Sequence, residues 1–284
     1  MTATILDGRT LAKTLREELR NQAQIFTSTT GIKPALAVVH IEGDAASERY
    51  VRSIRKLCDD LGIQFIKPPI LADVTQSTLE QAVHDVSSDD TIHGILLQLP
   101  LPAGLDQAGV VAQLDPRKDV DGVHPTNAGL LLQGTPRFVP NTPAGGIELL
   151  RRYGITLAGK RAVVVGRSVV VGKPMALLLL NDHATVTIVH SRTPDLAAVV
   201  REAEIVAVAA GRAGLVTGAM LQPGAVVIDF GINVLEDGSL VGDVDFTSVV
   251  EVASAITPVP GGTGPMTNMM LLQNVLRAAE ALTQ

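Results

Sequence analysis

Short runs of apolar residues, bounded by turns, alternate along this chain with segments whose apolar positions recur at helical spacing. Such an alternation is typical of α/β units built around a mostly parallel sheet. In the first half we expect the helices and strands to follow one another as helix 10–24, strand 35–41, helix 46–61, strand 64–67, helix 76–87 and strand 93–98.

A second series of strands follows a stretch at 114–140 that has no strong periodic signal and is interpreted as a loop and linker. A helix at 144–153 precedes this second series, whose strands are expected at 161–165, 185–189, 205–208, 225–229 and 255–256. The pattern predicts an α/β fold of two lobes with a cleft between them, the second lobe Rossmann-like. We expect one domain over 1–140, joined by the terminal helix 267–284, and a second over 141–266.

Composition narrows the class of protein. With 284 residues, 46% hydrophobic and 18% charged, the chain is expected to be compact and globular. A net charge of −6 without a basic run argues against nucleic acid or an anionic membrane as partner. The single Cys58 and six histidines without ligand spacing give no reason to expect a metal. With neither a signal core nor a bilayer-long apolar run, we expect a cytoplasmic protein.

The second lobe contains a candidate dinucleotide site. The apolar run 162–165 ends in Gly166, Arg167 and Ser168, and a helix is expected to begin near Gly172. This arrangement brings backbone N–H groups and a helix N-terminus close to an anion such as a pyrophosphate. The usual G-x-G-x-x-G spacing is absent, so the motif by itself is weak evidence.

The next strand in this lobe indicates which dinucleotide is bound. NAD sites place an acidic residue at its end to hold the ribose hydroxyls. Here the strand 185–189 is followed by His190, Ser191 and Arg192, without a carboxylate. Arg192 and Ser191, together with Arg167, can hold a 2′-phosphate through charge-assisted hydrogen bonds, which favours NADP. The alternative is that both arginines are ordinary surface residues.

A loop rich in glycine and proline spans 256–267, with three residues of each kind. Prolines fix the path of such a loop, and glycines let its backbone approach a ligand closely. Alternatively, the loop only turns a corner. We expect Thr267 to cap the terminal helix that follows.

Three separate segments of the first lobe carry further candidates. Tyr50 lies near the start of a helix, Gln98 ends a strand before a proline-rich exit, and Asp121 lies in an acidic loop. Each has a simple structural explanation when taken alone. Tyr50 fits the edge of a core, Gln98 a strand cap and Asp121 a turn.

Taken together and in order, these motifs resemble the methylenetetrahydrofolate dehydrogenase/cyclohydrolases of one-carbon metabolism, from Leu6-Asp7-Gly8 to the last helix. The resemblance implies that Tyr50 stacks against the folate, Gln98 supports the reacting centre and Asp121 hydrogen-bonds the pterin. It also implies that the loop with Pro260 and Gly261 closes over folate and nicotinamide, and that the chain forms a homodimer through the cofactor domain. The NADP-binding residues that it implies are Gly166, Arg167, Ser168, Ser191, Arg192 and Ile232.

One departure from the family concerns the chemistry directly. Bifunctional members carry a lysine four residues after the tyrosine, and this chain has Ile54 there. At ~100° per residue, position 54 lies within ~40° of Tyr50 around the helix and faces the same way. In the family the lysine serves the hydrolysis of the methenyl cation, where proton transfer contributes ~10²–10⁴-fold. Hydride transfer to the nicotinamide depends mainly on positioning.

We therefore expect NADP-dependent oxidation of 5,10-methylenetetrahydrofolate to be kept and the cyclohydrolase step to be weak or lost. One alternative is a bifunctional enzyme that makes 10-formyltetrahydrofolate, in which another group or an ordered water replaces the lysine. Another is a non-catalytic folate- or NADP-binding protein. The presence of Tyr50, Gln98, Asp121 and the loop at 257–267 argues against that last possibility.

Overall fold

The computed structural model describes residues 2–283, which form two compact units. Unit 1 contains the residues before Leu15 together with Pro140–Met270. Unit 2 contains Leu15–Val139 and the residues from Leu271 onward. Two of the three boundaries between the units fall inside the first and the last helix of the chain, so each of these helices contributes residues to both units.

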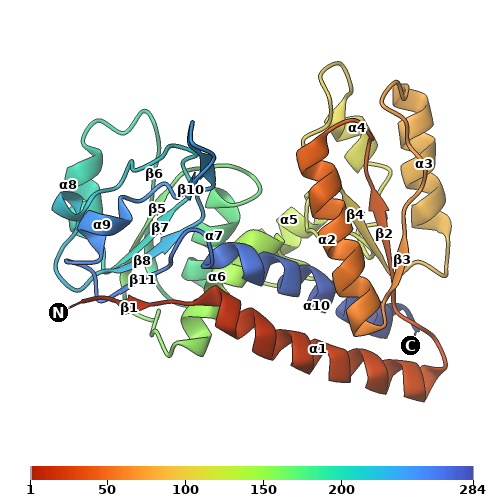
Figure 1. The fold of residues 1–284 in the computed structure, drawn as a ribbon, viewed down its shortest axis with the longest axis horizontal. Coiled ribbons are helices and arrows are strands. Elements are labelled where there is room, and N and C mark those ends of the chain that lie inside the picture. Colours follow the sequence, from red (N-terminus) through yellow and green to blue (C-terminus); the bar gives the residue numbers. More distant parts are fainter. Residues whose placement is uncertain (1, 284) are drawn as a thin grey trace. The chain divides into compact units, whose positions relative to one another are not determined.

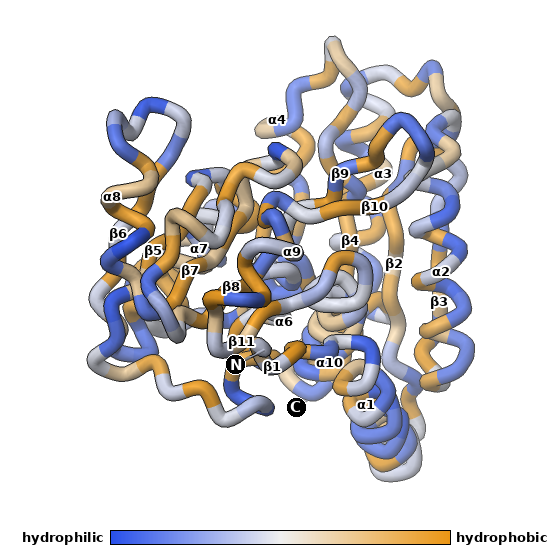
Figure 2. The backbone as a smooth tube through the Cα atoms, turned by 60° about the vertical axis from the view of Figure 1, so that its left-hand side comes forward, coloured by the Kyte–Doolittle hydropathy of each residue, from blue (hydrophilic) through white to orange (hydrophobic). Residues whose placement is uncertain are grey.

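Unit 1 is built on a six-stranded parallel sheet with strand order β1-β11-β8-β7-β5-β6 (Figure 1). Its inner strands are buried along most of their length, which explains why they read as continuous apolar runs, drawn largely in orange in Figure 2. The strands are β1 (Thr4–Ile5), β5 (Arg161–Val165), β6 (Thr185–Val189), β7 (Ile205–Val208), β8 (Val226–Asp229) and β11 (Ala255–Ile256).

Shorter elements complete unit 1. A two-stranded antiparallel ribbon, β9 (Asn233–Val234) with β10 (Leu240–Val241), follows the sheet strand β8. The helices are α6 (Asn141–Arg152), α7 (Gly172–Asn181), α8 (Leu196–Arg201), α9 (Phe246–Val249) and the 3₁₀ turn η1 (Gly218–Met220).

The N-terminus differs from the expected domain boundaries, which placed all of 1–140 in the first domain. Thr4 and Ile5 of β1 pair in parallel with Ala255 and Ile256 of β11, so they extend the sheet of unit 1. A two-residue strand has no detectable period, and its partner lies about 250 residues away in the sequence, so local patterning could not reveal it.

Unit 2 contains a smaller parallel sheet of three strands in the order β3-β2-β4. The strands are β2 (Ala35–Val39), β3 (Gln64–Ile66) and β4 (Gly94–Leu97). The helices are α2 (Ala45–Leu61), α3 (Gln76–Ser88), α4 (Gln107–Val111), α5 (Pro125–Leu132) and the greater parts of α1 (Gly8–Thr30) and α10 (Thr263–Thr283).

The order of the strands places α2 and α3 on opposite faces of this sheet. The chain crosses from β2 to β3 through α2 and then returns past β2 to β4 through α3. Because parallel crossovers are right-handed, connections that run in opposite directions cover opposite faces, as Figure 1 shows. Val39 of β2 and Leu97 of β4 pack in one buried cluster with Leu79 and Val83 of α3. Residues that alternate with Val39 and Leu97 therefore face α2.

Two expectations about loops are corrected. The stretch at 114–140 contains α5, whose eight residues are too few to show a recognisable helical period in the sequence. Helix α10 begins at Thr263, so the glycine/proline loop is shorter than expected and Thr267 lies inside the helix rather than capping it. Pro265 is compatible with this start because a proline in the first turn displaces no intrahelical hydrogen bond. Within residues 2–283 no helix has the length and apolar character needed to cross a bilayer.

Candidate functional site

A cavity of about 440 Å³ lies in unit 1, where the carboxyl ends of β5, β6 and β7 open into loops. Ligands of open α/β sheets bind at this edge. Four of the six predicted cofactor residues line it, whereas Arg192 and Ile232 are not among the lining residues. The full lining is Val165, Gly166, Arg167, Ser168, His190, Ser191, Thr193, Leu196, Ala209, Ala210, Arg212 and Leu215.

Two glycines make the phosphate-side turn of this cavity possible. Gly166 has φ 127°, and a Cβ there would lie 2.1 Å from the carbonyl oxygen of Ala209. A Cβ on Gly172, at the start of α7, would lie 2.4 Å from the carbonyl oxygen of Gly166. The Ser168 hydroxyl accepts hydrogen bonds from the N–H groups of Val171 and Gly172, both at 3.2 Å. The turn therefore brings backbone close to backbone and leaves the helix N-terminus beside the cavity.

The side chains expected to recognise a 2′-phosphate lie at the solvent-exposed edge. Arg167, Ser191 and Arg192 are all exposed. The loop after β6 is ordered by its own polar groups, because the N–H of Arg192 donates to Nδ1 of His190 at 3.2 Å. The N–H of His190 in turn donates to the Thr193 hydroxyl at 3.0 Å. These contacts fix the backbone of the loop and leave the guanidinium groups in solvent, where an anionic ligand can reach them.

Two buried carboxylates hold the neighbouring loops of unit 1. Asp229, 2% exposed, accepts from the N–H groups of Gly231, Asp243 and Val244 at 2.8, 3.0 and 2.9 Å. Burial raises the pKa of Asp229 to about 6 in spite of these bonds. Asp243 accepts from the N–H groups of 210, 211 and 212 beside the cavity. The interpretation of Asp229 as a residue that orders loops is confirmed.

The glycine/proline loop of unit 1 packs against the start of α1. The N–H of Arg9 donates to the carbonyl oxygen of Gly261 at 3.1 Å, and a Cβ on Gly8 would lie 1.8 Å from the carbonyl oxygen of Gly262. The Val259-Pro260 peptide is cis, and Gly261 has φ 117°. Pro260 is exposed while Gly261 is buried. The loop thus has a defined path with its proline at the surface.

In unit 2, Tyr50 lies in the second turn of α2. The helix is capped by Asp44, whose side chain accepts from the N–H of Ser47 at 2.7 Å. Burial raises the pKa of the Tyr50 phenol well above its usual range, and the negative charge of Asp121 adds to this effect. Because the Asp121 charge acts on the phenol, these two predicted residues lie near one another in unit 2.

Gln98 comes directly after β4, at the carboxyl end of the three-stranded sheet. Its N–H donates to the carbonyl oxygen of Val39 at 2.9 Å, which holds it beside the end of β2. The Leu99-Pro100 peptide that follows is cis. In the alternation along β4, Leu97 faces α3, so the Gln98 side chain points toward the α2 face of the sheet.

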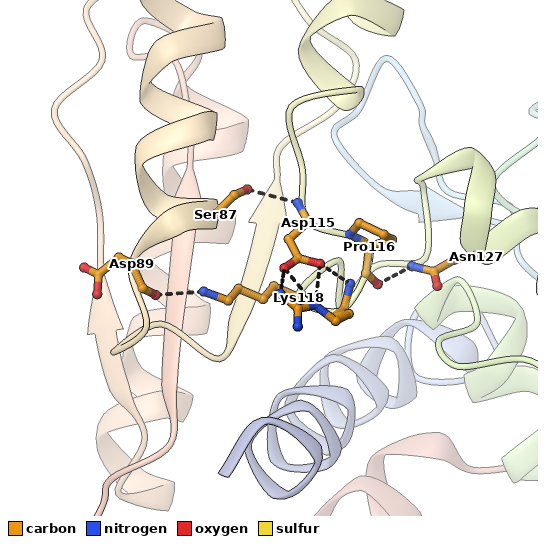
Figure 3. Close-up of polar contacts among 7 residues, drawn as sticks. Ser87, Asp89, Asp115, Pro116, Lys118 and Asn127 are labelled. Atoms are coloured by element: carbon orange, nitrogen blue, oxygen red, sulfur yellow. Dashed lines mark hydrogen bonds and ion pairs between the residues drawn. The ribbon is translucent and has the colours of Figure 1, made fainter. Parts of the chain in front are cut away.

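The acidic loop that carries Asp121 is fixed by buried polar contacts, several of which appear in Figure 3. The ammonium group of Lys118 donates to the carbonyl oxygen of Asp89 at 2.8 Å, and the N–H of Asp115 donates to the Ser87 hydroxyl at 3.1 Å. The Asn127 amide donates to the carbonyl oxygen of Pro116 at 2.9 Å.

Asp119 is the centre of this loop and is fully buried. It accepts from the N–H of His124 and the amide of Asn127, both at 2.8 Å, and burial raises its pKa. A parallel bridge to Ile95 places Asp119 beside β4, and a turn follows in which the N–H of Gly122 donates to the carbonyl oxygen of Asp119 at 3.1 Å. Asp121 lies in this turn, and its charge acts on the Tyr50 phenol.

Comparison with known proteins identifies the family. Residues 6–121 match the tetrahydrofolate dehydrogenase/cyclohydrolase catalytic domain, and residues 140–283 match the NAD(P)-binding domain of the same family. The chain belongs to this family. It is 68% identical to the bifunctional protein FolD of Roseiflexus sp. (strain RS-1) over 280 residues, covering 99% of this chain and 97% of the relative.

Solved structures agree with this assignment. The bifunctional FolD of Campylobacter jejuni aligns with a TM-score of 0.96 and 43% identity, over 98% of this chain and 99% of the other. The Trypanosoma brucei enzyme, solved with NADP and an inhibitor, aligns with a TM-score of 0.94 and 39% identity, over 99% and 98% of the two chains. The expected family and α/β fold, with a catalytic and an NAD(P)-binding domain, are therefore confirmed.

Within this tetrahydrofolate dehydrogenase/cyclohydrolase, the structure gathers the predicted residues into two groups. Tyr50, Gln98 and Asp121 lie in unit 2, and the cofactor residues and the loop with Pro260 lie in unit 1. Their roles stay predictions, as does the cleft expected between the lobes. Ile54 is fully buried in α2, one turn after Tyr50.

Sequence reasoning missed one residue of interest. His40 follows β2 directly, beside Gln98, and is 1% exposed. The sequence gives it no signal beyond its position at a strand end.

Proposed function

We propose that this protein oxidises 5,10-methylenetetrahydrofolate to 5,10-methenyltetrahydrofolate with NADP, and that its hydrolysis of the methenyl product is weak. The observation that carries the proposal is the pairing of an intact dinucleotide cavity with Ile54 in the substrate unit. The cavity retains its glycine turn and the Ser168 contacts at the start of α7. Position 54 is apolar and fully buried.

The two reactions make different demands on the protein. In the oxidation, hydride leaves the methylene carbon for the nicotinamide, and the folate nitrogens stabilise the cation that forms, so the enzyme contributes mainly positioning. Tyr50, Gln98 and Asp121 supply this positioning in the proposal. In the hydrolysis, water attacks the methenyl carbon and protons must move, which an isoleucine side chain cannot assist.

NADP is favoured over NAD by the end of β6. Ser191 and Arg192 stand where an NAD site carries a carboxylate, and an arginine beside the ribose can pair with a 2′-phosphate. The Trypanosoma brucei relative, solved with NADP, supports the same choice.

A bifunctional enzyme is the second candidate, because the relatives at 59–68% identity are all named bifunctional. In that candidate another group of this chain takes the place of the lysine and hydrolysis is fast.

One experiment separates the candidates. Purified protein is mixed with methylenetetrahydrofolate and NADP, and NADPH and the methenyl product are followed together. A parallel run starts from the methenyl compound and measures its decay against a no-enzyme control. NADPH with accumulating methenyl product supports the proposal, and rapid methenyl decay in both runs supports the bifunctional candidate. No NADPH with either NADP or NAD would contradict both.

We also propose a homodimer formed through unit 1. Strand β6 is an edge strand, and Ile188 on it is 42% exposed, as is Leu180 of α7 at 55%. An open edge with exposed apolar side chains is suited to pairing with a second copy. Light scattering after size-exclusion chromatography tests this, and a monomer at micromolar concentration would contradict it.

A further inference from the structure

His40 is a buried titratable group whose ring nitrogens have no hydrogen-bond partner in the described part of the chain. It is 1% exposed, and neither Nδ1 nor Nε2 has a hydrogen-bond partner among residues 2–283. Buried polar side chains in folded proteins are paired in the large majority of cases, because an unpaired one loses its hydration without compensation. A leucine or valine at the end of β2 would avoid this loss. The histidine therefore calls for an explanation other than stability.

The alternation along β2 places the imidazole on the α2 face of the sheet. Val39 packs on the α3 side, so His40 points to the other face. Gln98 has the same orientation at the end of β4, and its N–H donates to the carbonyl of Val39. His40 and Gln98 are consequently neighbours at the carboxyl edge of unit 2, on the face covered by the helix that carries Tyr50 and Ile54.

Burial is the main reason why the His40 imidazole is neutral near pH 7. Burial lowers the pKa of the imidazole, and the nearby Lys67 lowers it further. Glu48 of α2, together with Glu42 and Asp44 of the preceding loop, acts in the opposite direction with smaller effect. A neutral imidazole has one nitrogen that accepts a proton and one that donates.

Two cations of this part of unit 2 are already engaged with carboxylates. The Lys67 ammonium pairs with Glu42 at 3.0 Å, and the Arg52 guanidinium lies 3.6 Å from Glu48. Ile54 itself has no titratable atom. His40 is thus a neutral, unpaired proton acceptor on this face of the substrate unit.

We propose that His40 is the proton-transfer residue for the methenyl hydrolysis that this chain retains, an inference that rests on the proposed function. A water lone pair forms the C–O bond to the methenyl carbon, and the π pair of the C=N⁺ bond moves to nitrogen. His40 accepts a proton from that water. The carbonyl then forms as the C–N5 bond breaks, N5 takes the second proton of the water, and His40 releases its proton to solvent. The net products are 10-formyltetrahydrofolate and one proton.

The test compares His40→Gln and His40→Leu with the unaltered protein. Gln keeps a polar side chain without a titratable nitrogen, and Leu removes both unpaired nitrogens. His84→Gln is the control, because His84 is an exposed histidine on α3. Methenyl decay is measured from about pH 4.5 to 8.5, a range that extends well below the ordinary pKa of histidine because the pKa of His40 is lowered, with the no-enzyme rate subtracted at each pH. NADPH formation is measured on the same preparations.

We expect both His40 variants to lose ~10²-fold or more in hydrolysis, or to reach the no-enzyme rate, and to lose far less in NADPH formation, because hydride transfer needs no proton acceptor. Hydrolysis by the unaltered protein should fall as the pH drops through the lowered pKa of His40, and this dependence should vanish in the variants. His40→Leu should melt no lower than the unaltered protein.

The inference is overturned if the His40 variants hydrolyse methenyltetrahydrofolate at the unaltered rate and with the unaltered pH dependence. It is also overturned if the unaltered protein shows no hydrolysis above the control at any pH. In both cases NADPH formation leaves the proposed dehydrogenase standing. If no NADPH forms with NADP or NAD, the proposed function itself fails. Should His40→Gln fold poorly, the comparison is made on His40→Leu alone.

Discussion

Replacing Ile54 with lysine should give this protein the fast hydrolysis that we expect it to lack. Ile54 is fully buried in α2, one turn after Tyr50, and the Asp121 charge acts at the same site. A lysine there has a longer, unbranched stem, and its nitrogen can extend toward that polar edge. The matched control is Ile54→Met, which has a similar unbranched shape and no titratable group.

The burial of position 54 determines how much each substitution should lower stability, and the gain in hydrolysis is set against that loss. A volume-conserving swap such as Ile54→Met should destabilise the fold by less than ~1.5 kcal/mol. A fully buried lysine has its pKa lowered by up to ~3–5 units, so the charged form is destabilised by up to ~4–7 kcal/mol. The Asp121 carboxylate offsets part of this. Against that loss, a positioned proton-transfer group should raise hydrolysis ~10²–10⁴-fold over Ile54→Met.

The sign of the pH effect provides a separate check. With its pKa lowered in the folded state, the introduced lysine binds fewer protons there than in the unfolded chain, so the stability of Ile54→Lys should rise with pH above that pKa. Methenyl decay and urea unfolding are measured for both variants between about pH 6.5 and 8.5, where a buried lysine can lose its proton. If Ile54→Lys folds, forms NADPH and hydrolyses no faster than Ile54→Met, the reasoning about position 54 is refuted.

Three further predictions concern unit 1. Asp229 has a folded-state pKa of about 6 against 3.8 unfolded, so its protonation should add about 1 kcal/mol to the free energy of unfolding between pH 7 and pH 5, an increment that Asp229→Asn should lack in urea titrations. Gly166→Ala should destabilise by more than ~2 kcal/mol and abolish NADP binding measured by calorimetry, whereas Gly129→Ala, in α5 with no atom within 4 Å of the added Cβ, should stabilise by up to ~1 kcal/mol. Arg192→Ala should raise the KM for NADP ~10–100-fold and leave the KM for NAD unchanged. The control is Arg161→Ala, because Arg161 lies at the amino end of β5, away from the cavity at its carboxyl end. Equal losses for both cofactors would contradict the 2′-phosphate role.

The sequence predicted the elements whose signals are local. The buried strands of both sheets appear as apolar runs because helices or loops cover both of their faces, and the strand-turn-helix unit at Gly166 places four predicted cofactor residues around one cavity. Arg192 and Ile232 lie outside its lining, since exposed side chains at a loop edge are not fixed by packing.

What the sequence missed depends on contacts between distant segments. Strand β1 exists only through its pairing with β11. Helix α10 begins four residues before Thr267, at Thr263, whose hydroxyl donates to the carbonyl oxygen of Asp229 at 3.1 Å. A proline-rich run conceals such a start. The burial of His40 is likewise invisible in the local sequence, since only the fold shows that its ring has no hydrogen-bond partner among residues 2–283.

The two reactions of this family can be separated because they draw on different kinds of structure. Hydride transfer depends on how substrate and cofactor are positioned. Many groups contribute to this positioning, among them glycine turns, helix starts and buried carboxylates such as Asp229 and Asp243, which accept hydrogen bonds from loop backbone. No single side chain of that set is the acceptor of a proton. Hydrolysis depends on one titratable atom near the reacting carbon. In our proposal, the isoleucine at position 54 therefore removes most of one activity and spares the other, and His40 at the end of β2 supports the hydrolysis that remains.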